Sequence, residues 1–567
     1  MKTLKYIAAA LVFFSASSCR TLEEYNESPN QIPVGNAQPC DMMDEIICSG
    51  ALNCQQRFYD TYAELMQYTC VTSSSNEVIS RYYIAPSYIE NCWNHFSRWA
   101  ANADHMYKLA ERDDDDNYKA VALTLRAMYM DMLVSTFGYV PFSEAFKIRE
   151  GINKPVFDSP KEIYSQLIID LETANELYDT SKNLSNVKKD KLYAGDTKKW
   201  QKFTNSLMLR LLMRMSLRST EMEIIWGESV VDKVKKIIDN PGTYPVMTDY
   251  EDNACVYFTG EAPFQNTWGG YTESTLAGHR FTEHMYNLMK PQTNGSRGGD
   301  PRVYLWFMPY SAAYGWIGIQ SGIPGDDMQS AGYSVMNFQT MNDYKLPYSF
   351  MNCDEVYFLK AEAYANNEDD WKQISGSENT IRELYNMGIK KSCEFWRHIY
   401  CEVLGYKGRF ITKSTQPVYR NFFACNDDYS DDTPYELTYT DKKDGQTLVP
   451  VISDPAIEYY YTTVAPFDIK DGVRCILEQK YIANFRVGLE GWCDYRRTGI
   501  PEMTILDGTY NNHILPYRLV YPNRTKSTND ENYQALLSTL SSTYYDGADN
   551  MLTPIWWSEA ALSREIR

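Results

Sequence analysis

The sequence lacks the short motifs by which many catalytic and metal sites are recognised. It contains no Cys-x-x-Cys pair, no Gly-x-Ser-x-Gly elbow and no Gly-x-x-x-x-Gly-Lys phosphate loop. These motifs are typical of zinc or redox sites, serine hydrolases and nucleotide-binding loops. Its 567 residues include only 6 histidines, and their spacing does not suit a shared metal. We therefore expect a protein without metal, cofactor or catalytic activity.

Positive charge and long apolar runs are also scarce. Lys and Arg number 55 against 74 Asp and Glu, which gives a formal net charge of −19. A surface this acidic repels phosphate backbones and anionic lipids, so nucleic-acid binding is not expected. Beyond the N-terminus, no uncharged apolar run reaches the roughly 20 residues that a membrane-spanning helix needs.

The N-terminus has the pattern of an export signal. Lys2 and Lys5 precede an apolar run over residues 6–14, and small residues then lead to Cys19. This order of basic, apolar and small residues is typical of a secretory signal peptide. A cysteine at the cleavage point is where a bacterial lipoprotein is lipidated. The sequence predicts a signal peptide over 1–18, lipidation of Cys19 and a polar tether over 19–38.

The other cysteines leave two interpretations open. Their even number in an exported chain permits disulfides, but several lie in apolar helical runs, where buried free thiols are equally expected. Their spacing is irregular, and the pairing stays undetermined; they are residues 40, 48, 54, 70, 92, 255, 353, 393, 401, 425, 475 and 493.

Hydrophobic periodicity predicts a mainly α-helical fold. The clearest helix is 117–137, where apolar residues recur at steps of three and four from Tyr118 to Leu133. Further helices are expected at 41–70, 91–112, 160–178, 197–218, 352–366, 376–396 and 472–486. Long loops are expected at 71–90, 240–350, 405–470 and after 500, with short strands within 240–350. Arg210, Arg214 and Arg218 form a stripe that we interpret as salt-bridging or solvated.

Six segments resemble, in order, the SusD/RagB family of Bacteroidetes outer-membrane lipoproteins. They include Phe137-Gly-Tyr-Val-Pro-Phe and Gly491-Trp-Cys-Asp-Tyr-Arg-Arg-Thr-Gly-Ile-Pro. The six are 117–145, 200–214, 300–302, 351–364, 479–501 and 515–522. The resemblance implies a single domain over 39–567 with tetratricopeptide-like helix pairs and long ordered loops. It also implies a lipid anchor at the cell surface, ligand capture without chemistry, and a SusC-like TonB-dependent transporter as partner.

One residue in these segments predicts a specific contact. Glu362 lies within an apolar helical stretch, where an unpaired carboxylate would be costly. We expect an arginine partner, with Arg496 and Arg497 as the candidates.

The ligand site is expected in two loop regions, because family members draw on loops there. A sugar ring stacks on an aromatic face while its hydroxyls need polar partners. In the Gly-rich region the candidates are Trp268, Tyr271, Tyr310, Tyr314 and Trp316, with Trp268 the first choice of stacking platform. In the Ser-rich region they are Asn76, Arg81, Tyr82 and Tyr83. We expect an oligosaccharide ligand.

Three alternatives remain open on the sequence. A peptide ligand is the first, because RagB-like members of the family bind peptides and the motifs do not separate the branches. A surface glycoside hydrolase is the second, since it needs only two suitably spaced carboxylates. Calcium at Asp427, Asp428, Asp431 and Asp432 is the third, but this run lacks a spaced loop pattern and a glycine turn, so a solvated loop is expected.

Overall fold

The computed structural model describes residues 36–272, 275–276, 278–291, 299–310, 315–329, 331–366, 368–374, 376–404, 439–440, 447–448, 452, 454–543 and 549–558. Cys19, Tyr314 and the acidic run 427–432 lie outside these residues, so what was predicted of them stays a prediction. The described chain is mainly helical with short strands. This confirms the predicted fold class.

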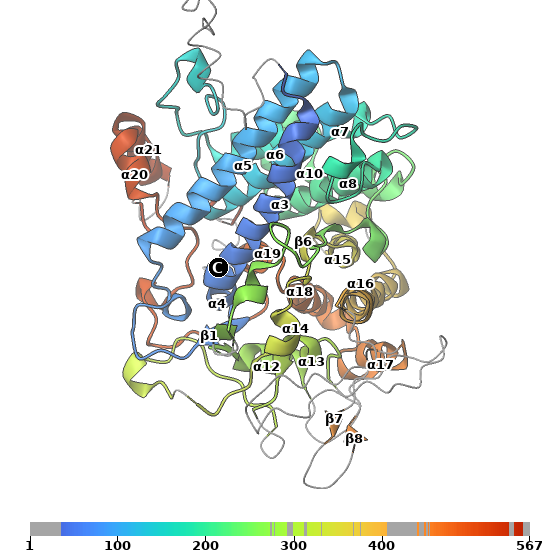
Figure 1. Cartoon of the computed structure of the whole chain (residues 1–567), viewed down its shortest axis with the longest axis vertical. Helices are drawn as coiled ribbons and strands as arrows, with labels where there is room; N and C mark the ends of the chain where they lie inside the picture. The colour runs from blue at the N-terminus through green and yellow to red at the C-terminus, as the bar shows by residue number, and fades with distance from the viewer. Residues whose placement is uncertain are drawn as a thin grey trace, which may run out of the picture.

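Antiparallel helices packed in pairs form the upper part of the molecule (Figure 1). They are α3 (Pro39–Arg57), α5 (Pro86–Arg112), α6 (Asp116–Phe137), α7 (Pro160–Leu177), α8 (Thr197–Arg214), α9 (Ser219–Trp226) and α10 (Val230–Asp239). Helix α5 begins five residues before the predicted start, because Pro86 supplies the fixed φ angle that suits a first helical position.

Helix α6 lies at the centre of this layer, in contact with α5, α7 and α8. Its N-cap Asp115 accepts a hydrogen bond from the Tyr118 backbone N–H at 3.1 Å, and Gly138 ends it with a φ of +83°. Among the described helices, α6 is the one whose length and hydropathy would suit a membrane span, but 94% of its apolar window is buried in the fold. It is a core helix.

The second half of the chain adds a smaller helical group and the loop-bearing end. The helices are α12 (Glu283–Met289), α13 (Val303–Trp306), α14 (Phe338–Met341), α15 (Cys353–Ala365), α16 (Glu378–His398), α17 (Asp454–Tyr459), α18 (Gly472–Ala483), α19 (Glu490–Thr498), α20 (Asn523–Thr528) and α21 (Asp530–Thr543). Short α4 (Ala63–Leu65) follows α3 through a π-helical turn. Helices α12 and α13 lie in the lower part of Figure 1, and α20 and α21 at the upper left.

Short antiparallel strands connect the loops at the lower end. One sheet has the order β1-β3-β5-β4 and another pairs β2 with β6. The strands are β1 (Thr69–Val71), β2 (Ala254–Val256), β3 (His279–Phe281), β4 (Phe307–Met308), β5 (Val335–Met336), β6 (Tyr348–Met351), β7 (Tyr439–Thr440) and β8 (Thr447–Leu448). Pairing of Thr69 with Phe281 sets the residues that precede β1 beside the start of α12.

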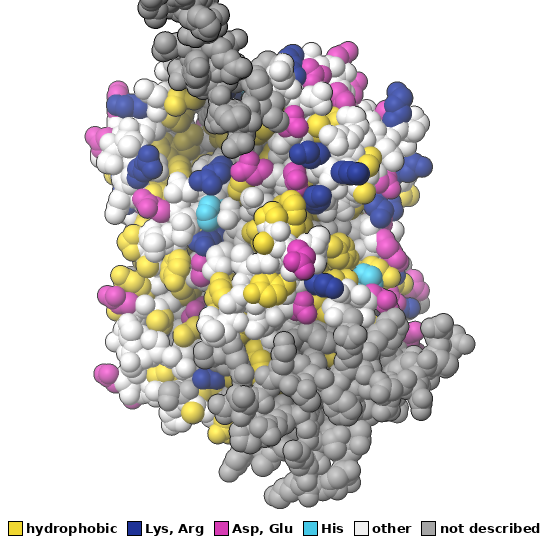
Figure 2. Space-filling model, viewed as in Figure 1, with side chains coloured by type: hydrophobic (Ala, Val, Ile, Leu, Met, Phe, Trp, Pro, Cys, Tyr) yellow, Lys and Arg dark blue, Asp and Glu magenta, His cyan; other side chains and the backbone are white. Residues whose placement is uncertain are grey.

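On the face shown in Figure 2, hydrophobic side chains gather in patches near the centre, with acidic and basic side chains interspersed around them. The net negative charge of the chain therefore does not form one continuous acidic surface on this face.

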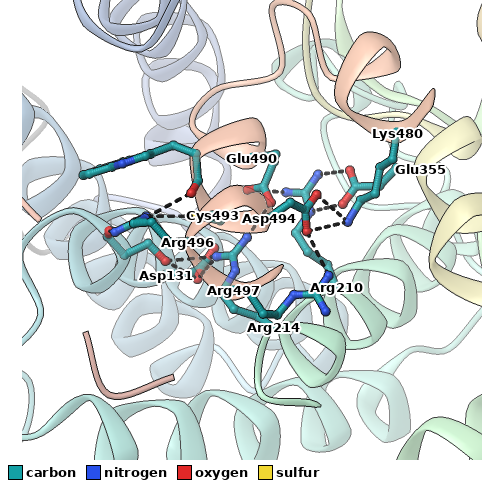
Figure 3. Close-up of polar contacts among 12 residues, drawn as sticks. Asp131, Arg210, Arg214, Glu355, Lys480, Glu490, Cys493, Asp494, Arg496 and Arg497 are labelled. Carbon is teal, nitrogen blue, oxygen red and sulfur yellow. Dashed lines mark hydrogen bonds and ion pairs between the residues drawn. The ribbon is translucent and has the colours of Figure 1, made fainter. Parts of the chain in front are cut away.

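A buried ionic network connects the two halves of the chain (Figure 3). Arg214 on α8 pairs with Asp131 on α6 and Glu490 on α19. One turn earlier, the Arg210 Nε donates to Glu355 Oε1 at 2.8 Å. These side chains are at most 4% exposed. The salt-bridging interpretation of the arginine stripe is confirmed for both residues, and removing one partner would leave a buried charge uncompensated.

The predicted partner of Glu362 is Arg497. Its Nη1 and Nη2 lie 2.6 and 3.1 Å from the two Glu362 oxygens, a bidentate pair. Arg497 also forms an ion pair with Asp494. Burial by itself would raise the pKa of Asp494, but the positive charges of Lys480 and Arg497 outweigh burial and lower this pKa. Arg496 instead stacks over Trp492, 3.5 Å from its ring centre.

The tail after residue 500 was expected to be loop, which is wrong, because α20 and α21 form there. Apolar residues are sparse in both helices, and α21 is held because Tyr533, Leu536 and Leu540 pack in the core. No disulfide joins any two of the eleven cysteines that the structure describes, and all but Cys475 are buried. They behave as apolar core residues.

Candidate functional site

The two loop regions predicted to form the site do meet, and Arg81 joins them. Its guanidinium donates to the backbone carbonyls of Ser73 at 2.9 Å, Ser75, and Ile323 at 2.5 Å. Arg81, one of the predicted ligand-binding residues, is fully buried, and these carbonyls already occupy its guanidinium. Arg81 instead holds the loop after β1 against the segment 320–327.

Asn76 and two glycines complete this junction. The Asn76 Oδ1 accepts a hydrogen bond from the Gly325 backbone N–H at 2.9 Å. A Cβ at Gly325 would lie 2.2 Å from the Ser74 carbonyl oxygen, and one at Gly508 would lie 2.4 Å from the Gly322 carbonyl oxygen. Only glycine allows such close backbone approach. The segment 501–514 thus packs against the same loop cluster as its third segment.

An aromatic ring pair lies on the surface of this cluster. The backbone N–H of Tyr510 donates to the Arg81 carbonyl at 2.7 Å, which places its ring 5.8 Å from that of Tyr83, with the planes inclined at 56°. Tyr510 is 45% exposed and Tyr83 half-buried. Tyr82 faces the other way and is buried, because its φ of +63° turns the chain at that residue. We call Tyr83 and Tyr510 the ring pair.

A polar pocket of about 450 Å³ is formed in part by segments that pack on this loop cluster. The segment 501–510 runs from the pocket wall to Tyr510, and the Ser321 hydroxyl, also in the wall, donates to the Ser80 carbonyl at 3.3 Å. The pocket is lined by Gln67, Glu283, His284, Asn287, Leu288, Gln320, Ser321, Arg474, Glu478, Pro501, Glu502, Met503 and Thr504. Its volume lies within the roughly 300–1,000 Å³ of small-molecule sites.

Local structure holds the pocket residues in place. Thr282 caps α12 by accepting from the Met285 backbone N–H at 3.1 Å, and its hydroxyl donates to the Gln67 carbonyl at 2.5 Å. The Gln67 amide in turn donates to the Thr504 carbonyl at 2.9 Å. Because α12 carries Glu283 and His284 and α18 carries Glu478, two helices and two anchored loops make up the wall.

The pocket is weakly acidic and rich in hydrogen-bonding groups. Burial lowers the pKa of His284 to about 4, so its imidazole is neutral at pH 7. Burial raises the pKa of Glu478, although Arg474 and Lys290 oppose that shift. Arg474 lies 3.4 Å from Glu502 at the exposed rim. Such a pocket can hydrogen-bond hydroxyls and amides, and it would favour a cationic group over an anionic one.

The aromatic residues predicted from the Gly-rich region are largely turned into the core. Trp268 is fully buried, 4.9 Å under the Arg486 guanidinium, and Trp316 packs edge-on against Phe281 at 5.6 Å. The expectation that these two rings are exposed is wrong, because the loops that carry them fold inward and their large apolar area belongs to the core. Tyr271 and Tyr310 are half-buried, and the Tyr271 hydroxyl donates to Gln56 at 2.7 Å.

Sequence reasoning missed Tyr510 and the carboxylates of the pocket. Tyr510 lies in Asp507-Gly-Thr-Tyr-Asn-Asn, a turn-rich run around one aromatic residue that could have marked it. Glu283 and Glu478 lie on helices far apart in the sequence, and no local pattern connects them. Among the residues that the structure describes, no group of three or more His, Cys, Asp and Glu has an arrangement that could hold a metal ion.

The fold is a helical scaffold that carries the candidate site on ordered loops. A family model described as starch-binding and associating with the outer membrane, SusD-like, matches residues 29–522. The chain belongs to this family, which confirms the resemblance seen in the six segments.

Solved structures share the fold. A SusD homolog from Bacteroides fragilis is 20% identical with a TM-score of 0.68, over 92% of this chain and 98% of that chain. A chitin-binding SusD homolog from Flavobacterium johnsoniae is 22% identical with a TM-score of 0.64, over 92% and 98%. A SusD homolog from Parabacteroides distasonis is 20% identical with a TM-score of 0.67, again over 92% and 98%. No curated protein matches the chain.

Proposed function

We propose that this protein captures oligosaccharides at the cell surface on the ring pair and in the polar pocket. The observation that carries the proposal is the exposed ring pair together with a pocket lined by amides, carboxylates and a neutral imidazole. A sugar ring presents an apolar face that stacks on an aromatic ring, and its hydroxyls need both donors and acceptors. The family description as starch-binding supports the same ligand class.

The protein then hands its ligand to a transporter without altering it. Support for this step comes from the export signal, from Cys19 as lipid anchor and from the family resemblance, which together imply a SusC-like TonB-dependent barrel as partner in the outer membrane. The domain is taken as one unit over 39–567, in keeping with a hydrophobic core that is continuous from Cys40 to Trp557.

Calorimetry on protein without residues 1–18, with Cys19 replaced by serine, tests the ligand. We expect maltoheptaose or tetra-N-acetylchitotetraose to bind, and Tyr510→Ala to weaken binding by roughly 2 kcal/mol, about thirtyfold. Tyr257→Ala is the matched control, because Tyr257 is similarly exposed, at 42%, but does not line the pocket. Equal loss of affinity in both variants, or none in Tyr510→Ala, would contradict the proposed site. Product released from either glycan would revive the hydrolase alternative.

A peptide ligand is the second candidate, and the acidic lining of the pocket favours it. Glu283 and Glu478 share the wall of the pocket. Two such carboxylates suit a lysine side chain or an amino terminus. Binding of a lysine-containing tetrapeptide that Glu478→Gln weakens, while neither glycan binds, would favour this candidate over the glycan.

A further inference from the structure

A second cavity lies on elements that the ring pair and the polar pocket do not use. It encloses about 530 Å³ between the first turn of α7, helix α9 and helix α21. In Figure 1, α21 lies at the upper left, whereas α12, in the wall of the polar pocket, lies in the lower part. The cavity is lined by Tyr139, Val156, Phe157, Ser159, Pro160, Lys161, Glu162, Glu221, Asn532, Ala535, Leu536, Thr539 and Trp556.

Contacts behind its walls fix the shape of this cavity. The Trp556 Nε1 donates to Glu221 Oε2 at 2.9 Å, and Arg218 donates from Nε to the Trp556 carbonyl at 2.8 Å. On the opposite wall, Phe157 packs edge-on against Tyr521 at 5.5 Å. The Asn532 amide donates to the Lys154 carbonyl at 2.8 Å, which holds α21 against the loop before α7. A ligand would meet a preformed site and would not have to order it.

The charges around the cavity are largely neutralised by the protein itself. Ser159 and Glu162 form a capping box, with the Ser159 backbone N–H 3.1 Å from Glu162 Oε2. The Glu162 carboxylate therefore already supplies the negative charge that the N-terminus of α7 favours. Glu221 is paired with Arg218 at 2.9 Å. An anionic ligand would therefore meet Glu162 and Glu221, with Lys161 as the one cation in the lining. The lining suits a neutral ligand with polar groups.

We propose that this cavity is a second saccharide-binding site. The proposal rests on the proposed function, since it concerns the same class of ligand. Tyr139 and Phe157, both half-buried, offer aromatic surface for the apolar face of a sugar ring, and the polar side chains of the rim offer hydrogen bonds to its hydroxyls.

A site-specific signal can test the cavity even when binding is weak. Protein labelled with 5-fluorotryptophan gives a ¹⁹F NMR resonance for Trp556, which Trp556→Phe identifies by its loss. Titration with maltoheptaose or tetra-N-acetylchitotetraose should move this resonance with a saturable midpoint. Ala535→Phe places a bulky ring in the cavity from an exposed helical position and should abolish the movement. Gln534→Phe, exposed on the same helix but outside the lining, should leave it unchanged.

The outcomes separate this proposal from the proposed function. A Trp556 resonance that still moves in Tyr510→Ala, with the wild-type midpoint, supports an independent second site. A Trp556 resonance that stays fixed while calorimetry detects glycan binding overturns the second site and leaves the ring pair in place. Movement that persists in Ala535→Phe, once circular dichroism has shown the variant to be folded, also overturns it. If calorimetry detects no binding of either glycan and the resonance is fixed, the proposed function fails together with the second site.

Discussion

Replacing Trp268 by alanine should destabilise the protein and leave its ligand affinity unchanged. The indole is fully buried, 5.2 Å from the ring of Tyr59 and 4.9 Å from the Arg486 guanidinium. Trp→Ala in a core costs about 3–5 kcal/mol. The upper end is expected here, because Arg486 has no carboxylate partner among the described residues and burial already lowers its pKa to about 10. Without Trp268, the Arg486 guanidinium would lose its cation–π contact with the indole, which contributes roughly 2 kcal/mol when it is shielded from water.

Urea denaturation followed by circular dichroism measures this change, with Tyr510→Ala as the comparison. Tyr510 is 45% exposed, and its loss should alter the free energy of unfolding by less than about 1 kcal/mol while it reduces glycan affinity. The expected pattern is therefore reciprocal between the two variants. A Trp268→Ala protein of unchanged stability whose glycan affinity has fallen about thirtyfold would refute the reasoning and restore Trp268 as a ligand contact.

Three further changes test the core, the loop cluster and the anchor. Arg497→Met leaves Glu362 buried without its partner and should cost about 3–5 kcal/mol in a thermal or urea melt, most of which Arg497→Met with Glu362→Leu should recover; an unchanged single variant would contradict the pairing. Burial raises the pKa of Glu64 from 4.5 to about 7, so the folded chain keeps this proton to a higher pH than the unfolded chain does. The free energy of unfolding therefore falls as pH rises from about 4.5 to about 7, by up to roughly 3 kcal/mol. Glu64→Gln should remove that loss in denaturation curves across this range, and parallel pH profiles for variant and wild type would show that the carboxyl does not titrate there. Cys19→Ala should release the protein from the membrane fraction, and retention after alkaline washing would contradict lipid anchoring.

The helical scaffold could be predicted because its signals are local. Apolar steps of three and four define α6, and proline or glycine marks the ends of neighbouring helices. The arginines of α8 and Glu362 also followed from sequence, since a charged residue in an apolar helical stretch needs a partner to be buried. Helix α21 was missed because only a few of its residues are apolar and the rest of the core supplies the contacts that hold it.

Sequence by itself determined the family and the helical layers, and it predicted an export signal and two loop regions for the candidate site. Only the tertiary structure decided which aromatic rings face solvent. Trp268 and Tyr510 both lie in glycine-containing loops, yet the first is fully buried and the second 45% exposed. The difference depends on what lies opposite each ring: Arg486 and Tyr59 cover Trp268, whereas Tyr510 is set at the surface by its backbone bond to Arg81. Those partners are distant in sequence, and a loop carries no periodicity that would reveal which of its faces is buried.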